Sequence, residues 1–418
     1  MKILRTIRFV FCLTAFIGVA KAEESSANWP RFRGADGNGV CAKCDAPLNC
    51  DIKTGANIAW AVPVPAAGFS SPVVWGNRVF LSGGDKGNRE VMCFDVASGK
   101  LLWQVAVPKT DAKTEVPDQC GMAAGTVATD GLRVYAMFAN GDLAAFNFKG
   151  SISWSKNLGV PKNLYGHAAS LLTWQDRVIV QFDQGEADDK LSKLYAFDGA
   201  TGTVAWEKPR AVGSSWATPI VIEAAGKTQL ITLANPWVIA YAPKDGAEIW
   251  RAECLDGEVT PSPICVGGTL FVVHPTVKLQ AIRVDGMGDV TKTHLGWIAE
   301  DGIPDITSPV SNGELVFVTD PNGMVTCYDA KTGKKQWEHD FGDGCHASPS
   351  IVGNRVYLIT KKGALIVVEA ASHFKELARS LLGEPVFASP AFAQNKIFVR
   401  GIKHLICIES KNNASAKP

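Results

Sequence analysis

The chain has 418 residues, of which 46% are hydrophobic and 20% charged, and its formal net charge is +1 at pH 7. A charge this close to zero argues against a nucleic-acid-binding protein and against a protein held on a membrane by a basic surface. The composition is that of an ordinary soluble globular protein, and the 40 glycines suit a fold with many tight turns.

Residues 1–22 have the pattern of a secretory signal peptide. Lys2 and Arg5 precede an apolar run at residues 9–19, and the triplet at 20–22 resembles a cleavage site, so we expect cleavage after Ala22. The apolar run is shorter than a bilayer-spanning helix and no later run reaches that length. We therefore expect no membrane span and a periplasmic or secreted protein, and no lipoprotein cysteine follows the apolar run.

Residues 23–56, the lead-in, show no strand periodicity. They contain the stretch Asn-Trp-Pro-Arg-Phe-Arg-Gly at 28–34, the stretch Asp-Gly-Asn-Gly at 36–39, and three cysteines. The second stretch has the look of a calcium loop but lacks the acidic residue that would close one, so it predicts a turn. One strand follows at residues 57–62.

From there to residue 409 the chain repeats itself. A small-residue motif that enters a strand occurs eight times, at a spacing of roughly forty to fifty residues, which is typical of propeller blades. Its copies are GFSSP (68–72), GMAAG (121–125), GHAAS (166–170), SWATP (215–219), VTPSP (259–263), DITSP (305–309), CHASP (345–349) and VFASP (386–390).

Each unit ends on a second motif, Asp-x3-Gly-x3-Trp. It is clearest at Asp95/Gly99/Trp103, Asp198/Gly202/Trp206 and Asp329/Gly333/Trp337. Asp and Gly suit the turn between the third and fourth strands, and a Trp at a fixed position can pack between neighbouring sheets.

The eighth unit stops after its third strand, whereas an unpartnered strand at 57–62 precedes the first unit. Pairing the two closes the ring and removes two open sheet edges. The sequence therefore predicts an all-β protein: an eight-bladed β-propeller of four-stranded antiparallel blades over residues 57–409, its last blade closed by the N-terminal strand. A polar tail occupies residues 410–418.

These motifs and the eightfold count resemble the pyrroloquinoline quinone (PQQ)-type β-propeller repeat family. That family includes quinoprotein alcohol dehydrogenases and the outer-membrane assembly lipoprotein of Gram-negative bacteria. The resemblance implies PQQ and calcium as possible cofactors. The chain has no adjacent cysteine pair of the kind that covers the quinone, and its Cys-x-x-Cys, at Cys41 and Cys44, is followed by Asp45 rather than by the histidine of haem-bearing members.

We therefore expect an exported, non-catalytic scaffold that binds a small-molecule ligand or an envelope protein. The alternative is a PQQ- and calcium-dependent dehydrogenase of alcohols or sugars. No catalytic residue can be assigned, and whether the chain is an enzyme stays open at this point.

The loops that lead into the first strands should meet at the mouth of the central channel. The position three residues before the end of each motif carries several aromatic and histidine side chains, which suit a flat or sugar-like ligand. The same side chains could equally plug the channel by packing together. No carboxylate at suitable spacing completes a metal site with the histidines, so none is expected. The candidate ligand-binding residues are Phe69, Met122, Tyr165, His167, Trp216, Asp305, His346 and Phe387.

The cysteines divide by position. Cys93, Cys327 and Cys407 each stand two residues before the acidic end of a third strand, which predicts free thiols in the core. Cys265, on a first strand, is also predicted to be a free thiol in the core. In an exported protein the remaining ones are disulfide candidates, above all within the lead-in. These candidates are Cys41, Cys44, Cys50, Cys120, Cys254 and Cys345.

Overall fold

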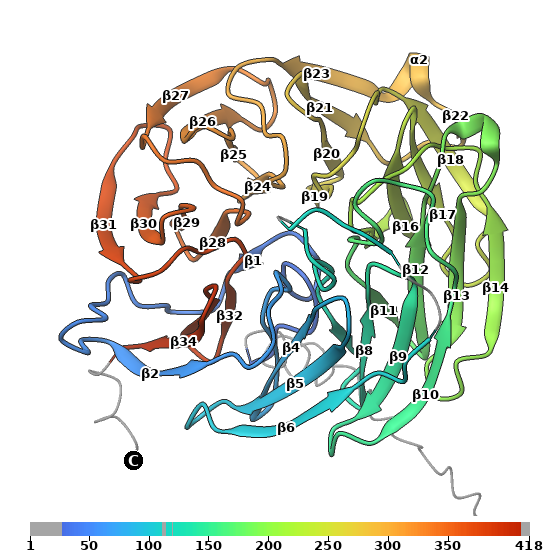
Figure 1. Cartoon of the computed structure of the whole chain (residues 1–418). Helices are drawn as coiled ribbons and strands as arrows, with labels where there is room; N and C mark the ends of the chain where they lie inside the picture. The colour runs from blue at the N-terminus through green and yellow to red at the C-terminus, as the bar shows by residue number, and fades with distance from the viewer. Residues whose placement is uncertain (1–26, 111–113, 119, 411–418) are drawn as a thin grey trace, which may run out of the picture.

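The computed structural model describes residues 27–110, 114–118 and 120–410. It forms a closed ring of eight β-sheets (Figure 1), as predicted. The predicted signal peptide and the tail beyond residue 410 lie outside the described residues. Within the described part, helix is limited to Ala27, η1 (Ala187–Asp189) and α2 (Thr291–His294). Over those same residues, no helix has the length and apolar character needed to cross a bilayer.

Each blade places its first strand at the centre of the ring and its fourth strand outside. The first strands are β3 (Val73–Trp75), β7 (Ala128–Thr129), β11 (Leu172–Trp174), β15 (Ile220–Ala224), β19 (Ile264–Val266), β24 (Val310–Ser311), β28 (Ser350–Val352) and β32 (Ala391–Ala393). The second strands are β4 (Arg78–Gly84), β8 (Arg133–Met137), β12 (Arg177–Phe182), β16 (Lys227–Ala234), β20 (Thr269–His274), β25 (Leu315–Thr319), β29 (Arg355–Ile359) and β33 (Lys396–Arg400).

The third strands are β5 (Arg89–Asp95), β9 (Asp142–Asn147), β13 (Lys193–Asp198), β17 (Trp237–Tyr241), β21 (Lys278–Arg283), β26 (Met324–Asp329), β30 (Ala364–Glu369) and β34 (His404–Glu409). The outer strands are β6 (Leu101–Ala106), β10 (Ile152–Asn157), β14 (Val204–Pro209), β18 (Glu248–Glu253), β23 (Leu295–Ala299), β27 (Lys335–Asp340), β31 (Glu376–Leu381) and β2 (Ile58–Pro63). Second and third strands are almost wholly buried because both their faces pack against other blades.

The ring closes through β2, which pairs antiparallel with β34, so that Trp60 lies opposite Cys407. The predicted closure by the N-terminal strand is therefore confirmed. Two short strands depart from the four-stranded pattern. β1 (Val40–Cys41) adds in parallel to β28, and β22 (Gly288–Asp289), from an insertion between β21 and β23, adds in parallel to β18.

The tryptophans of the second motif join neighbouring blades. The Trp154 indole donates a hydrogen bond to the carbonyl of Gly199 in the next blade at 3.0 Å. The same ring covers Gly202, which has a positive φ of 71°, and a Cβ there would lie 2.6 Å from the indole. Glycine is therefore required both by the backbone angle and by the ring above it.

The position opposite each tryptophan accepts only a small side chain. Cys93 pairs with Trp103 and Cys327 with Trp337, and both thiols are fully buried. Burial raises the pKa of the Cys93 and Cys327 thiols to about 12, so both stay protonated. The predicted assignment of these residues to the core is confirmed.

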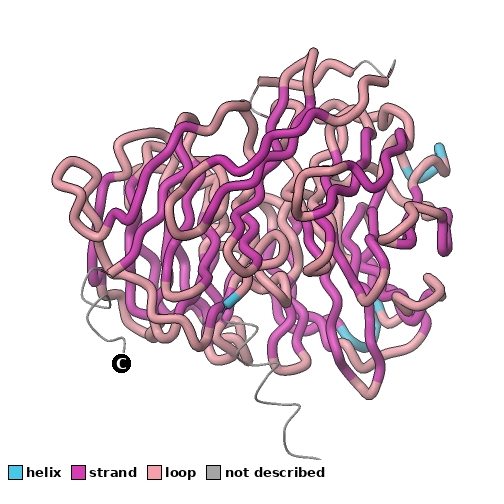
Figure 2. The backbone as a smooth tube through the Cα atoms, turned by 90° about the horizontal axis from the view of Figure 1, so that it is seen from below, coloured by secondary structure: helices cyan, strands magenta, loops and turns pink. Residues whose placement is uncertain are grey.

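The strands run between two faces made of loops (Figure 2). One face, the mouth face, carries the loops between blades and those between second and third strands, which bond to one another, as Ile402 N–H does to Pro385 O. The lead-in covers the opposite face. It bonds to turns between first and second strands there, Asn28 to Gly76 and Asp45 to Asn395.

Candidate functional site

A cavity of about 600 Å³ lies at the centre of the mouth face. Side chains from all eight blades and one from the lead-in line it. They are Phe32, Phe69, Ser71, Cys120, Ala124, Thr126, Tyr165, Ala168, Ser170, Trp216, Thr218, Glu258, Thr260, Ser262, Asp305, Ile306, Ser308, His346, Ser348, Phe387, Ala388 and Ser389.

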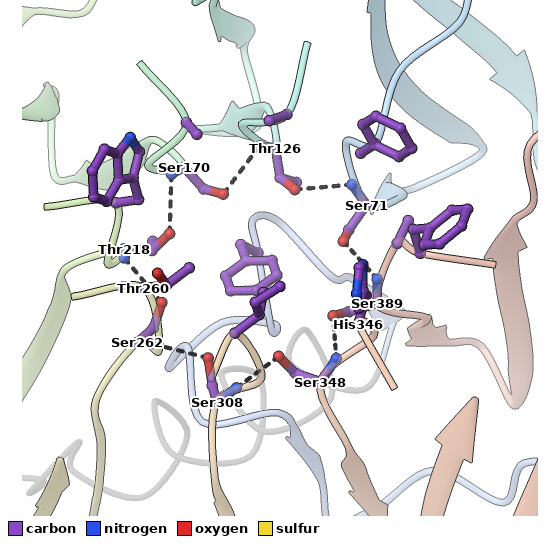
Figure 3. Close-up of a pocket in the computed structure, with 18 of the residues that line it drawn as sticks. Ser71, Thr126, Ser170, Thr218, Thr260, Ser262, Ser308, His346, Ser348 and Ser389 are labelled. Carbon is purple, nitrogen blue, oxygen red and sulfur yellow. Dashed lines mark hydrogen bonds between the residues drawn. The ribbon is translucent and has the colours of Figure 1, made fainter. Parts of the chain in front are cut away.

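The wall of the cavity is a closed circle of eight hydroxyl side chains, the hydroxyl ring (Figure 3). In each blade the backbone N–H of the ring residue donates to the hydroxyl oxygen of the ring residue in the next blade, at 2.9–3.1 Å, and the last blade bonds back to the first. Every member is at most 7% exposed. The ring consists of Ser71, Thr126, Ser170, Thr218, Ser262, Ser308, Ser348 and Ser389.

The ring fixes the true register of the repeats. In six blades the ring residue stands immediately before the proline of the motif, but in the second and third blades the motif has no proline. There the ring residue lies later than the fourth position of the motif, by two positions for Thr126 and by one for Ser170. Ala124 and Ala168 consequently line the cavity in place of Met122 and His167, which the motifs had suggested.

The other six candidate ligand-binding residues line the cavity: Phe69, Tyr165, Trp216, Asp305, His346 and Phe387. Their rings also contact one another. Tyr165 meets Trp216 edge to face with centroids 5.1 Å apart, and Phe387 contacts both Phe69 at 5.7 Å and His346 at 5.3 Å. The mouth is therefore built of packed aromatic pairs that still present surface to the cavity.

Met122 and His167 are buried behind the wall, 4% and 5% exposed. The His167 imidazole stacks on Phe182, and its Nε2 has no hydrogen-bond partner in the described structure. Burial, only partly offset by a hydrogen bond to the Ala169 backbone, lowers the pKa of His167 to about 4. This histidine is neutral at pH 7 and lies outside the cavity.

The buried histidine predicts a stability loss in mild acid. Unfolded histidine takes up a proton below its ordinary pKa of 6.5, whereas His167 in the fold does so only near 4. The unfolded state thus binds more protons between these values, and stability falls as pH falls from 6.5 to 4. We expect the wild type to lose about 2–3 kcal/mol more than His167→Gln over this range. Urea unfolding at several pH values measures the difference, and parallel pH profiles for the two proteins would contradict it.

The floor of the cavity comes from the lead-in. Phe32 lines the cavity, between Arg31 and Arg33, whose side chains are 3% and 2% exposed. Arg33 donates to the carbonyls of Pro309 and Pro349, which directly follow ring residues. Arg31 donates to Ala35 O at 2.9 Å and to Pro219 O at 3.4 Å. The lead-in thus closes the channel from the far face.

The cavity carries negative charge. Glu258 and Asp305 line it as exposed carboxylates, and neither forms an ion pair within the described residues. Glu258 is the main reason that the pKa of the Tyr165 phenol is raised. Burial lowers the pKa of His346, with a smaller effect of Lys361 in the same direction, so its imidazole is neutral at pH 7.

The predicted disulfide of the lead-in joins Cys41 and Cys44. The other candidates, Cys50, Cys120, Cys254 and Cys345, are free thiols, and of these Cys120 lines the cavity. Within the described chain, no group of three or more His, Cys, Asp or Glu side chains is placed to hold a metal ion.

Comparison with known proteins identifies the family. A family model described as outer membrane protein assembly factor BamB matches residues 48–180, 190–289 and 291–373. The chain belongs to this family. BamB of Alkalilimnicola ehrlichii is 25% identical over 218 residues, 52% of this chain and 51% of that protein. BamB of Moranella endobia is 26% identical over 227 residues, 50% of this chain and 55% of that protein. The chain thus spans about half the length of these relatives.

Solved structures share the fold at low sequence identity. The crystal structure of BamB from Moraxella catarrhalis is 14% identical with a TM-score of 0.63, covering 84% of this chain and 99% of that one. A europium-containing methanol dehydrogenase is 13% identical with a TM-score of 0.67, covering 92% of both chains. At such identities the likeness extends to the fold alone.

The cavity does not fit PQQ and calcium, the cofactors that the resemblance to quinoproteins implied. PQQ bears several carboxylate groups, which need cationic partners when they are taken from water. The described lining holds two carboxylates and no lysine or arginine. Within the described chain, the two carboxylates also belong to no cluster of three or more acidic, histidine or cysteine side chains, whereas calcium sites usually draw on several carboxylates.

Proposed function

We propose that this protein is a non-catalytic protein-interaction scaffold of the bacterial envelope that serves in the assembly of outer membrane proteins. The observation that carries the proposal is the match of the assembly-factor family model to three segments across the propeller. A periplasmic location belongs to the same proposal and agrees with the predicted signal peptide. The poor fit of the cavity to PQQ favours this function over a dehydrogenase.

The mouth face offers a contact surface for a protein partner. Six large apolar side chains are exposed there around the cavity, in the loops between blades or between second and third strands. Protein contact surfaces draw on exposed apolar side chains, and these six lie in loops of the face that holds the cavity. They are Val160, Leu164, Leu191, Val277, Ile306 and Ile402.

A deletion and complementation experiment tests the proposal. We expect loss of the gene to lower the amounts of β-barrel proteins in the outer membrane, and wild-type protein to restore them. A Leu164→Asp, Ile402→Asp variant should fold but fail to restore them, because charge opposes burial of the 62% and 46% exposed side chains under a partner.

The matched control is Leu132→Asp, which alters a 70% exposed leucine in a turn on the opposite face. Restoration by the control but not by the mouth-face variant supports a scaffold that works through this face. Unchanged barrel-protein levels after deletion would rule the proposed function out.

A further inference from the structure

The hydroxyl ring has unused hydrogen-bonding capacity. Each of its eight oxygens accepts one backbone N–H, but none of the hydroxyls donates to an acceptor within the described residues. A buried hydroxyl normally donates as well as accepts. Eight hydroxyl groups that are at least 93% buried therefore line one cavity and are available to donate hydrogen bonds to a ligand there.

The rim of the cavity supplies hydrogen-bond acceptors. Glu258 and Asp305 are carboxylates, which only accept hydrogen bonds at pH 7, and neither has a cationic partner in the described residues. A ligand that satisfies wall and rim together must offer both acceptors and donors. An anion such as phosphate would be repelled by the rim, and a simple cation would leave the hydroxyl ring unsatisfied.

Aromatic surfaces complete the site. Phe32 from the lead-in and Tyr165 at the mouth line the cavity as half-buried rings, and Trp216, which is 7% exposed, backs Tyr165. Trp216 is fixed by its indole N–H, which donates to Gly166 O at 3.0 Å, and by its edge-to-face contact with Tyr165. Rigid aromatic faces of this kind bind flat apolar surfaces such as the C–H face of a pyranose.

We infer that the cavity binds a neutral pyranose sugar. Its hydroxyl oxygens accept from the hydroxyl ring, its hydroxyl groups donate to Glu258 and Asp305, and its C–H face packs on the aromatic side chains. The volume of about 600 Å³ lies within the usual range for small-ligand sites of about 300–1,000 Å³. The inference goes beyond the scaffold function and does not rest on it.

Calorimetry and saturation-transfer NMR with the purified protein test the inference. The sugar probes are methyl β-D-glucopyranoside, N-acetylglucosamine and cellotriose, and the controls are choline and inorganic phosphate. We expect sugar binding with saturation concentrated on ring C–H protons. If cellotriose binds clearly more tightly than the monosaccharides, the natural ligand is the terminal part of a glycan. If the affinities are equal, the natural ligand is a free sugar.

Variants locate the site. Glu258→Gln and Asp305→Asn alter exposed side chains and leave the fold intact, and each should weaken sugar binding at least about tenfold through loss of a charged acceptor. Asp256→Asn is the matched control, because Asp256 lies on the same loop as Glu258 but does not line the cavity. This variant should leave sugar binding unchanged. Ser308→Thr should retain binding, because threonine already fills the ring at Thr126 and Thr218.

Three results would overturn the inference. They are absence of binding by all three sugars, binding of choline or phosphate in their place, and equal sugar affinity in wild type, Glu258→Gln and Asp305→Asn. The proposed scaffold function is tested separately, because its variant at Leu164 and Ile402 leaves the cavity lining unchanged.

Discussion

Arg33→Met is expected to destabilise the protein by about 3–5 kcal/mol, because it leaves several buried carbonyl oxygens without a donor. The Arg33 side chain donates to four carbonyls, of Gly37, Asn38, Pro309 and Pro349, at 2.5–3.3 Å. Methionine fills similar space but leaves these oxygens without donors. The last two belong to neighbouring blades, so the loss affects the closure of the ring as well as the lead-in.

Urea unfolding measures the effect, with Arg283→Met as the control. The Arg283 side chain is 61% exposed, so the same substitution there should change stability by at most about 0.5 kcal/mol. Arg33→Lys keeps a charge but loses the planar fork and should fall between the two. A loss below about 1 kcal/mol for Arg33→Met would mean that the lead-in is not a structural part of the ring.

Asp183→Asn is expected to cost about 3–5 kcal/mol, because it leaves a buried guanidinium without its counter-ion. Asp183 follows β12 and Arg210 follows β14, and both side chains are 0% exposed. Two hydrogen bonds join them, at 2.8 and 3.2 Å, and Arg210 also donates to Thr232 of the next blade at 2.6 Å. The pair therefore links the third and fourth blades beneath the mouth face.

The double variant Asp183→Leu, Arg210→Met provides the critical comparison. Because no isolated charge remains buried, it should be more stable than Asp183→Asn, even though two residues are changed. Urea unfolding of the single variants Asp183→Leu and Arg210→Met, and of the double variant, gives the coupling free energy between the two positions. If the double variant lost as much as the two singles combined, the pair would not act as a unit.

Local patterns were sufficient to predict the propeller. Asp329, Gly333 and Trp337 recur at fixed spacing because one four-stranded blade requires a turn and an inter-blade contact at those points. The same register placed Cys327 opposite Trp337 and assigned it to the core. It also left the strand at 57–62 without a partner, which predicted the pairing of β2 with β34.

The candidate site was predicted only in part. Phe69, Trp216, His346 and Phe387 were found because their motifs end in proline, which marks the register. Met122 was misplaced relative to the cavity because its motif lacks that proline. The ring residues recur in six of the eight blades as a Ser or Thr before proline, so this signal could have located them there, although not their meeting around a cavity.

The sequence by itself determined the number of blades, the closing strand and the core positions, because each depends on contacts that recur with the period of the repeat. Only the tertiary structure revealed the lead-in as the floor of the cavity and the hydroxyl ring as its wall. The lead-in has no periodicity, and Arg33 binds carbonyls 276 and 316 residues away. The ring arises only when eight separate strands meet around one axis, so no single stretch of sequence contains it.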